Sequence, residues 1–340
     1  MYVFKLTFKS ALHVDSKGSG EPVSAQEFIH SDTLSAAIAL AWAELFEERS
    51  EEFFLNLPFQ VSSGFPYVKD VLLFPLPCWD VWAKPKQEQS EKQEVKQRKK
   101  IKKIKWISKS LFEDLLNGNQ LTSQEILDNA IEGIAFSQAE KEKLADLGEK
   151  FWVISERQRV KIDRLGLKQE GGLFFFGLQF FAPGCGLYFL ADVAKDKLDK
   201  LKAAITFLGD TGLGADRNCG LGHFQLQNVT KLCLNLPSKN NSWTILSLFN
   251  PDPTEDDLKN LTQYSAYNIL ERSGWIVHST LGRPPVMVFA EGSFFSAQPK
   301  GRILPLLDQN IREKNKLNLS HSAPRDFRAF ALPSQVNTGE

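Results

Sequence analysis

The sequence contains no continuous run of about 18 apolar residues, the length that a membrane-spanning helix needs, so no membrane span is predicted. Its first residues alternate as in a strand and lack a basic stretch followed by an apolar one, so no signal peptide is expected. Cysteine is scarce and widely spaced, which disfavours a zinc site and a disulfide framework; the four are Cys78, Cys185, Cys219 and Cys233. We therefore predict a reduced, cytoplasmic protein with no metal, no cofactor and no membrane contact.

An excess of charge of one sign is also absent, because 41 Lys and Arg residues balance 41 Asp and Glu residues. A protein that coats nucleic acid through charge alone is disfavoured by this balance. The basic residues do cluster at 95–105 (VKQRKKIKKIK), which has seven Lys or Arg and no acid and follows a polar stretch at 84–94. We interpret residues 83 to about 97 as a mobile insertion. The basic run is either a solvated tract or an RNA contact, and the sequence leaves both open.

Glycine is concentrated between residues 209 and 224, where five occur in sixteen residues around one arginine. Glycine admits positive φ angles and close approach of a partner, and successive N–H groups can form a concave nest for phosphate oxygens. A helical pattern precedes this loop at 195–208 and a strand pattern follows it at 223–234. Nucleotide-binding loops run from strand to helix instead. The order therefore favours a loop that holds an RNA backbone, with a flexible surface connector as the alternative.

The run GLGADRNCGLGHF, residues 212–224, resembles the glycine-rich loop of the RAMP superfamily, the repeat-associated RNA-binding proteins of CRISPR systems. Other segments resemble the family's opening strand and turn, its helix start, its Ile-Asp-Arg strand and its C-terminal motif pair, at residues 4–8 and 11–14, 29–37, 160–164, and 274–277 with 289–294. The resemblance runs from Met1 to about Pro333. As an ordered set, these segments are similar to the subunit that caps the crRNA 5′ end in type III-A (Csm) effector complexes.

The resemblance implies an RNA-binding subunit without catalytic activity. Its expected partners are the crRNA 5′ tag, a large polymerase-like signalling subunit and an adjacent backbone RAMP subunit. Two other functions stay open: a metal-independent CRISPR repeat endoribonuclease of the same superfamily, and a backbone subunit that repeats along the guide. The resemblance also implies that the insertion is a thumb folded over the guide.

The order of patterns predicts an α+β fold with two ferredoxin-like (RRM-like) β-α-β-β-α-β domains, at 1–235 and 236–340, the first carrying an insertion at about 83–150. In the first domain we expect helices at 31–46 and 195–208 and strands at 2–9, 60–63, 71–75, 151–162, 173–190 and 223–234, with a Gly-Phe-Pro turn at 64–66. In the second we expect a helix at 257–272 and strands at 243–249, 275–280, 286–290, 301–307 and 327–333. Such a sheet leaves one face free for RNA.

Candidate RNA-binding residues come from three places. The loop contributes its glycines and neighbouring polar residues: Gly212, Gly214, Arg217, Asn218, Gly220 and Gly222. The strand near 157 contributes basic residues, of which the first three alternate onto one face: Arg157, Arg159 and Lys161, with Arg164 on the other. The turn after the first strand and the first helix start contribute His13, Ser31 and Thr33.

Three residues invite a catalytic interpretation. His13 and His30 have a side chain suited to general-base work, but neither has a paired acid–base group in the sequence. Asp32 stands at a helix start, where capping and the helix dipole are sufficient reason for a carboxylate. We therefore expect no catalytic residue.

Overall fold

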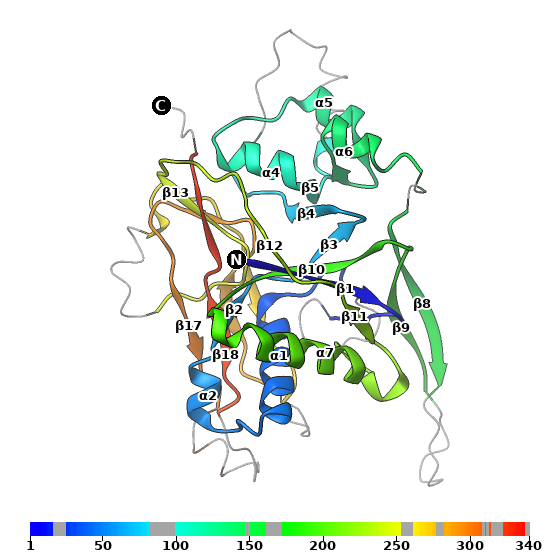
Figure 1. Cartoon of the computed structure of the whole chain (residues 1–340), viewed down its shortest axis with the longest axis vertical. Coiled ribbons are helices and arrows are strands. Elements are labelled where there is room, and N and C mark those ends of the chain that lie inside the picture. Colours follow the sequence, from blue (N-terminus) through cyan, green and yellow to red (C-terminus); the bar gives the residue numbers. More distant parts are fainter. Residues whose placement is uncertain are drawn as a thin grey trace.

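The computed structural model describes residues 1–15, 25–79, 81, 99–146, 148, 150–160, 172–252, 261–276, 282–307, 310, 313 and 322–336. Figure 1 shows one large sheet in the middle, two helices on one side of it, a helical cap on the other and a long hairpin at one flank. In the part of the chain that is described, no helix is both long and apolar enough to cross a membrane.

Strand β1 (Tyr2–Phe8) lies inside the large sheet, whose order is β11-β1-β10-β3-β4-β5-β7-β6, with β12 also on β1 and β2 also on β10. It pairs antiparallel with both β10 and β11. The other strands are β2 (Phe59–Val61), β3 (Phe65–Val68), β4 (Val71–Pro75), β5 (Trp106–Ser108), β6 (Ala130–Ile131), β7 (Ile134–Ala135), β10 (Cys185–Val193), β11 (Phe224–Leu226) and β12 (Thr230–Lys231).

Helices α1 (Ser31–Leu45) and α7 (Leu198–Thr211) cover one face of this sheet, and a short 3-10 turn (Lys195–Lys197) leads into α7. The strand alternation decides which side chains meet them: Phe4 and Leu6 of β1 are buried in the same cluster as Ile38 and Leu208. The α+β class is confirmed. The strand order is consistent with a β-α-β-β-α-β unit, and the ferredoxin-like description of both domains stays a prediction, as does the boundary at 235.

The opposite face is covered by the segment between β4 and β8. Its helices are α4 (Lys109–Leu116), α5 (Ser123–Asp128) and α6 (Gln138–Glu142). Phe112 of α4 stacks on Phe74 with ring centroids 4.3 Å apart, and the Tyr188 hydroxyl of β10 donates to the Leu73 carbonyl at 2.8 Å. The expectation that this face stays free for RNA is therefore wrong over β3, β4 and β10. Residues 84–98, with most of the predicted mobile stretch, lie outside the described residues.

Strands β8 (Trp152–Val160) and β9 (Leu173–Phe181) pair along nine residues each and form the hairpin that extends past the body in Figure 1. At its far end Val160 is 58% exposed and Leu173 is 59% exposed. The expected strand at 173–190 is instead two strands, because a turn at residues 182–184 ends β9 and starts β10.

Small sheets make up the C-terminal part. Their strands are β13 (Ser242–Ile245), β14 (Ile269–Arg272), β15 (Val286–Phe289), β16 (Phe294–Phe295), β17 (Gly301–Leu304), β18 (Arg325–Arg328) and β19 (Ala331–Ser334). Strands β13, β16 and β19 form one sheet, while β14 pairs with β15 and β17 with β18. These pairings confirm strands near 286 and 301.

Two predictions are wrong in whole or in part. The helix expected at 257–272 is wrong over its last residues, which form β14: Leu270 and Arg272 point inward while Ile269 and Glu271 are exposed, an alternation of period two. Residues 261–262 are helical, and 253–260 lie outside the described residues. The Gly-Phe-Pro turn is in fact the start of β3, in which Pro66 pairs with Leu187. A further helix, α2 (Glu51–Leu55), was not expected and is capped by the Ser50 hydroxyl.

Candidate nucleic-acid interface

The glycine-rich loop begins where α7 ends. Gly212 closes the helix with φ +88°, and Gly214, Gly220 and Gly222 have φ of +91°, +80° and +74°. These values confirm the prediction of positive φ in this loop. Residues other than glycine rarely adopt such angles, which explains why glycine occurs at these positions. Asp216 also has positive φ, +56°, a conformation that Asp and Asn tolerate better than most residues.

Three of these glycines are required by the loop itself. A Cβ atom would lie 1.8 Å from the Leu213 carbonyl oxygen at Gly222, 2.3 Å from the His13 oxygen at Gly214 and 2.7 Å from the Leu221 oxygen at Gly212. At Gly220 no atom lies within 4 Å of that position. Only Gly220 therefore leaves open space beside its backbone, and close approach of a partner is not the reason for glycine at the other three positions.

Backbone hydrogen bonds fasten the loop to the turn that follows β1. Ala215 N–H donates to the His13 carbonyl at 3.0 Å, and Gly222 N–H donates to the Ala11 carbonyl at 2.8 Å. Leu213 N–H closes the loop on the Gly222 carbonyl at 2.9 Å. The loop is thus a fixed structure, which removes the flexible-connector alternative.

His13 lies beneath the loop and is only 4% exposed. Its Nδ1 donates to the Gly177 carbonyl of β9 at 2.6 Å, and its ring is 4.2 Å from that of Phe176, measured between centroids. The candidate RNA-binding role of His13 is untested, but this burial assigns the side chain a place between the loop and the hairpin.

The tip of the loop, Arg217 to Gly220, is exposed. Among the described residues, the N–H groups of Arg217 and Asn218 have no acceptor, and they follow the left-handed Asp216 as successive donors. Such an arrangement forms a concave group of N–H donors that suits an anion. The tip therefore offers backbone donors and the Arg217 side chain to solvent.

The basic residues of β8 are not equivalent. Arg157 is exposed, with its guanidinium 5.0 Å from the Phe180 ring centroid. Arg159 forms an ion pair with Asp216 of the loop and lies 4.3 Å from the Phe176 ring centroid. Lys161 and Arg164 lie outside the described residues, so their predicted contacts stay predictions.

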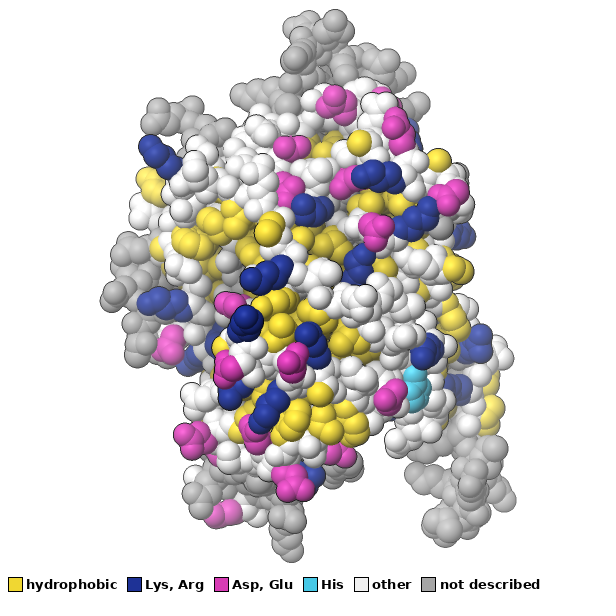
Figure 2. Space-filling model, in the orientation of Figure 1, with side chains coloured by type: hydrophobic (Ala, Val, Ile, Leu, Met, Phe, Trp, Pro, Cys, Tyr) yellow, Lys and Arg dark blue, Asp and Glu magenta, His cyan; other side chains and the backbone are white. Residues whose placement is uncertain are grey.

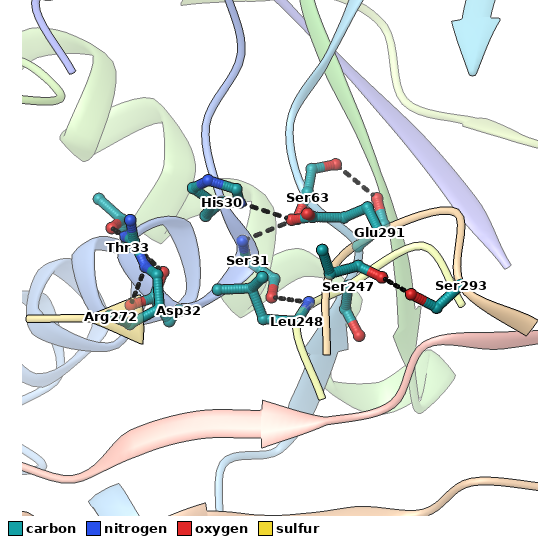
Figure 3. Close-up of polar contacts among 12 residues, drawn as sticks. His30, Ser31, Asp32, Thr33, Ser63, Ser247, Leu248, Arg272, Glu291 and Ser293 are labelled. Carbon is teal, nitrogen blue, oxygen red and sulfur yellow. Dashed lines mark hydrogen bonds and ion pairs between the residues drawn. The ribbon is translucent and has the colours of Figure 1, made fainter. Parts of the chain in front are cut away.

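The start of α1 is a buried junction with the C-terminal part of the chain, shown in Figure 3. Asp32 and Arg272 form an ion pair at 2.9 Å with side chains 1% and 3% exposed. His30 occupies the N-cap position and makes no side-chain capping bond. The interpretation of Asp32 as a helix cap is therefore wrong: its carboxylate neutralises an arginine from β14.

Ser31 and Thr33 take part in the same junction. Ser31 is 3% exposed, and its hydroxyl accepts the Leu248 N–H at 2.9 Å. The Thr33 hydroxyl accepts from Arg272 at 3.1 Å. Their predicted RNA contact is untested, and the burial of Ser31 argues against it.

A second buried pair lies beside the first. His30 Nδ1 is 2.8 Å from Glu291 Oε1, both side chains are 4% exposed, and Ser63 also donates to this oxygen. Burial alone raises the pKa of Glu291, but the attraction of His30 and the hydrogen bonds from His30 and Ser63 hold it below its usual value. Likewise burial raises the pKa of Asp32, while Arg272, Arg325 and His30 bring it below its usual value.

Sequence reasoning missed Arg272, Arg325 and the role of Glu291. For Glu291 a signal was available in the sequence, because its segment resembles a family motif. Arg272 gave no such signal, because it fell in a segment that was predicted to be a helix. In the described residues, no group of three or more His, Cys, Asp or Glu side chains is arranged to hold a metal ion.

The chain is similar in sequence to known proteins. The family described as "CRISPR Csm4 C-terminal domain" matches residues 238–322. A Csm4 protein of Methanocaldococcus jannaschii is 26% identical over 343 residues, covering 91% of this chain and 89% of that protein. A Csm4 protein of Thermococcus onnurineus is 29% identical over 183 residues, covering 53% of this chain and 54% of that protein.

Solved structures share the fold. A crystal structure of a Csm3-Csm4 subcomplex of the type III-A interference complex contains a chain with TM-score 0.66 and 20% identity, covering 98% of this chain and 99% of that one. A crystal structure of a Csm1-Csm4 cassette with cA4 gives TM-score 0.59 and 19% identity, covering 99% of each chain. The chain therefore shares the fold of these Csm4 chains.

We predict that Gly222→Ala destabilises the protein by at least about 2 kcal/mol, because its Cβ meets a backbone oxygen that cannot move aside. The matched change Gly220→Ala has open space and costs only about 1 kcal/mol, from its positive φ. Urea unfolding followed by circular dichroism measures both. Equal effects at the two positions would contradict the assigned contact.

We predict that Asp32→Asn lowers the free energy of unfolding by about 3–5 kcal/mol, because it leaves Arg272 buried without its counter-charge. Asp70→Asn, which breaks an exposed pair with Lys5, serves as the control and costs less than about 1 kcal/mol. Because the folded pKa of Asp32 is lowered, its contribution is complete above the unfolded pKa and is lost as pH falls through the folded one. Unfolding of wild type and Asp32→Asn along a pH series tests this: the difference shrinks toward acid, and a constant difference contradicts it.

Proposed function

We propose that this chain is a non-catalytic subunit of a type III-A CRISPR complex that binds the 5′ repeat-derived tag of the guide RNA. The observation that carries the proposal is the exposed loop tip, where N–H donors of Arg217 and Asn218 stand beside the Arg217 side chain. Oriented backbone donors with a guanidinium suit the phosphates of a single strand.

The hairpin β8–β9 supplies the second half of the proposed interface. It carries Arg157 in its outer half, on the same face as Arg159, and exposed apolar side chains on the opposite face, including Phe175 at 40% exposure and Val160 at 58%. Aromatic and apolar surface stacks on unpaired bases, while the loop holds the backbone. Figure 2 shows acidic and basic side chains interspersed over the visible face, so a general electrostatic coat is not supported.

The partners follow from the related structures. Similar chains were solved with Csm3 in one case and with Csm1 in another. On this basis we propose that the chain contacts an adjacent backbone subunit and the large subunit while it holds the guide. One copy per guide is expected, and native mass spectrometry of the co-purified complex measures that number.

The environment of the histidines supports a role without chemistry. His13 is buried against Phe176 with Nδ1 bonded to a carbonyl, and His30 is buried in its pair with Glu291. A general base must reach the proton that it removes. These two side chains instead hold segments of the fold together.

We predict that Arg217→Ala and Arg157→Ala each weaken binding of a labelled single-stranded RNA carrying the tag. Each change should also flatten the slope of log affinity against log salt by about 0.7, because one fewer counterion is released. Fluorescence anisotropy over a salt series measures both quantities. Lys141→Ala, on helix α6 at the other end of the molecule, is the control and should leave the slope unchanged; unchanged slopes for both arginine variants remove them from the interface.

We predict that the purified chain yields no discrete product when it is incubated with CRISPR repeat RNA in EDTA. Denaturing gel electrophoresis is the measurement, with His13→Ala as the paired variant. A specific product that disappears in His13→Ala would replace the binding proposal with the repeat endoribonuclease.

A further inference from the structure

A closed path of contacts joins the glycine-rich loop to the β8–β9 hairpin. The Asp216 carboxylate of the loop pairs with the Arg159 guanidinium of β8, at side-chain exposures of 35% and 28%. Arg159 in turn lies over the ring of Phe176 in β9, 4.3 Å from its centroid. The ion pair therefore ties the loop to both strands of the hairpin.

The path returns to the loop through His13. The Phe176 ring is 4.2 Å from the His13 ring, and the His13 carbonyl accepts the N–H of Ala215 at 3.0 Å. Ala215 directly precedes Asp216, so the path starts and ends on adjacent residues. His13 Nδ1 adds a bond to the Gly177 carbonyl next to Phe176. The loop and the hairpin consequently cannot shift against each other without breaking one of these contacts.

The charges distinguish the two arginines on this face of β8. Arg159 has a carboxylate partner that cancels its charge locally. Arg157, two residues earlier and on the same face, has no carboxylate within ion-pair distance among the described residues. Arg157 is therefore free for a phosphate, whereas Arg159 would have to release Asp216 beside that same phosphate.

We propose that Arg159 and Asp216 are positioning residues: their ion pair holds the glycine-rich loop against the hairpin in the conformation that binds RNA, and neither side chain binds phosphate itself. The proposal rests on the proposed RNA-binding function of this loop. It differs from the expectation from the sequence that both Arg157 and Arg159 contact RNA.

The direction in which one substitution changes RNA affinity distinguishes a positioning role from an effect of charge alone. Asp216→Asn removes a negative charge and keeps a residue that tolerates the positive φ of this position. If charge alone mattered, affinity for a labelled single-stranded RNA carrying the tag would rise and the salt slope would steepen by about 0.7. The positioning role instead predicts at least about a threefold loss of affinity, because a loosened loop loses preorganisation. Unchanged or higher affinity overturns the proposal.

A double-mutant cycle on the full-length protein tests whether the two residues act through each other. Arg159→Ala and Asp216→Asn should each speed amide exchange in segment 209–224, measured by hydrogen exchange with mass spectrometry, and the double variant should be no faster than the faster single one. Arg157→Ala is the matched control and should leave this exchange unchanged. Additive effects of Arg159→Ala and Asp216→Asn, or an equal effect of Arg157→Ala, overturn the proposal.

The two proposals fail differently. If wild-type protein does not bind the RNA, the proposed function fails, and amide exchange alone then decides whether the pair fixes the loop. If wild type binds RNA but exchange in the loop is insensitive to both substitutions, the positioning role fails while the proposed function stands.

Discussion

Backbone contact between the glycine-rich loop and the turn after β1 is the constraint on which the rest of the candidate interface depends. Gly214 and Gly222 have no room for a Cβ atom, because carbonyl oxygens of His13 and Leu213 occupy that space. This close approach brings the end of α7 to the start of the chain. It also places His13 where its ring meets the hairpin. The exposed tip is therefore built on a scaffold drawn from three distant parts of the sequence.

Charged side chains inside this protein join segments of the fold, whereas charges at a nucleic-acid surface attract phosphates. The buried Asp32–Arg272 pair and the His30–Glu291 pair join the start of α1 to the C-terminal part of the chain. Removing one member of such a pair leaves an uncompensated buried charge, which costs far more than loss of an exposed pair. These pairs hold the C-terminal part against the start of α1, and its strand β18 lies beside that helix.

Local features of the sequence predicted local structure well, and long-range pairing was out of reach. Gly212 and Gly214 have positive φ angles that glycine accepts readily and other residues rarely do. The conformation of the loop was therefore predictable from its glycines. Asp32 was misassigned because a carboxylate at a helix start looks the same whether it caps the helix or pairs with an arginine 240 positions away. Arg159 was grouped with Arg157 by alternation alone, which identifies a shared face but not the carboxylate that approaches it from the loop.

Under the proposed function, local compensation of charge also affects how the chain would bind RNA. Several exposed or half-exposed basic side chains already have acidic partners, among them Lys69 with Asp146 and Arg159 with Asp216. Basic side chains that are already paired release fewer counterions, so under the proposed function affinity depends less on salt than in a protein with an excess of basic residues. Directional donors and stacking surfaces then carry the binding, and both act only over short distances. A binding surface of this kind needs a rigid loop more than a charged one, because a donor displaced by an ångström no longer reaches its phosphate.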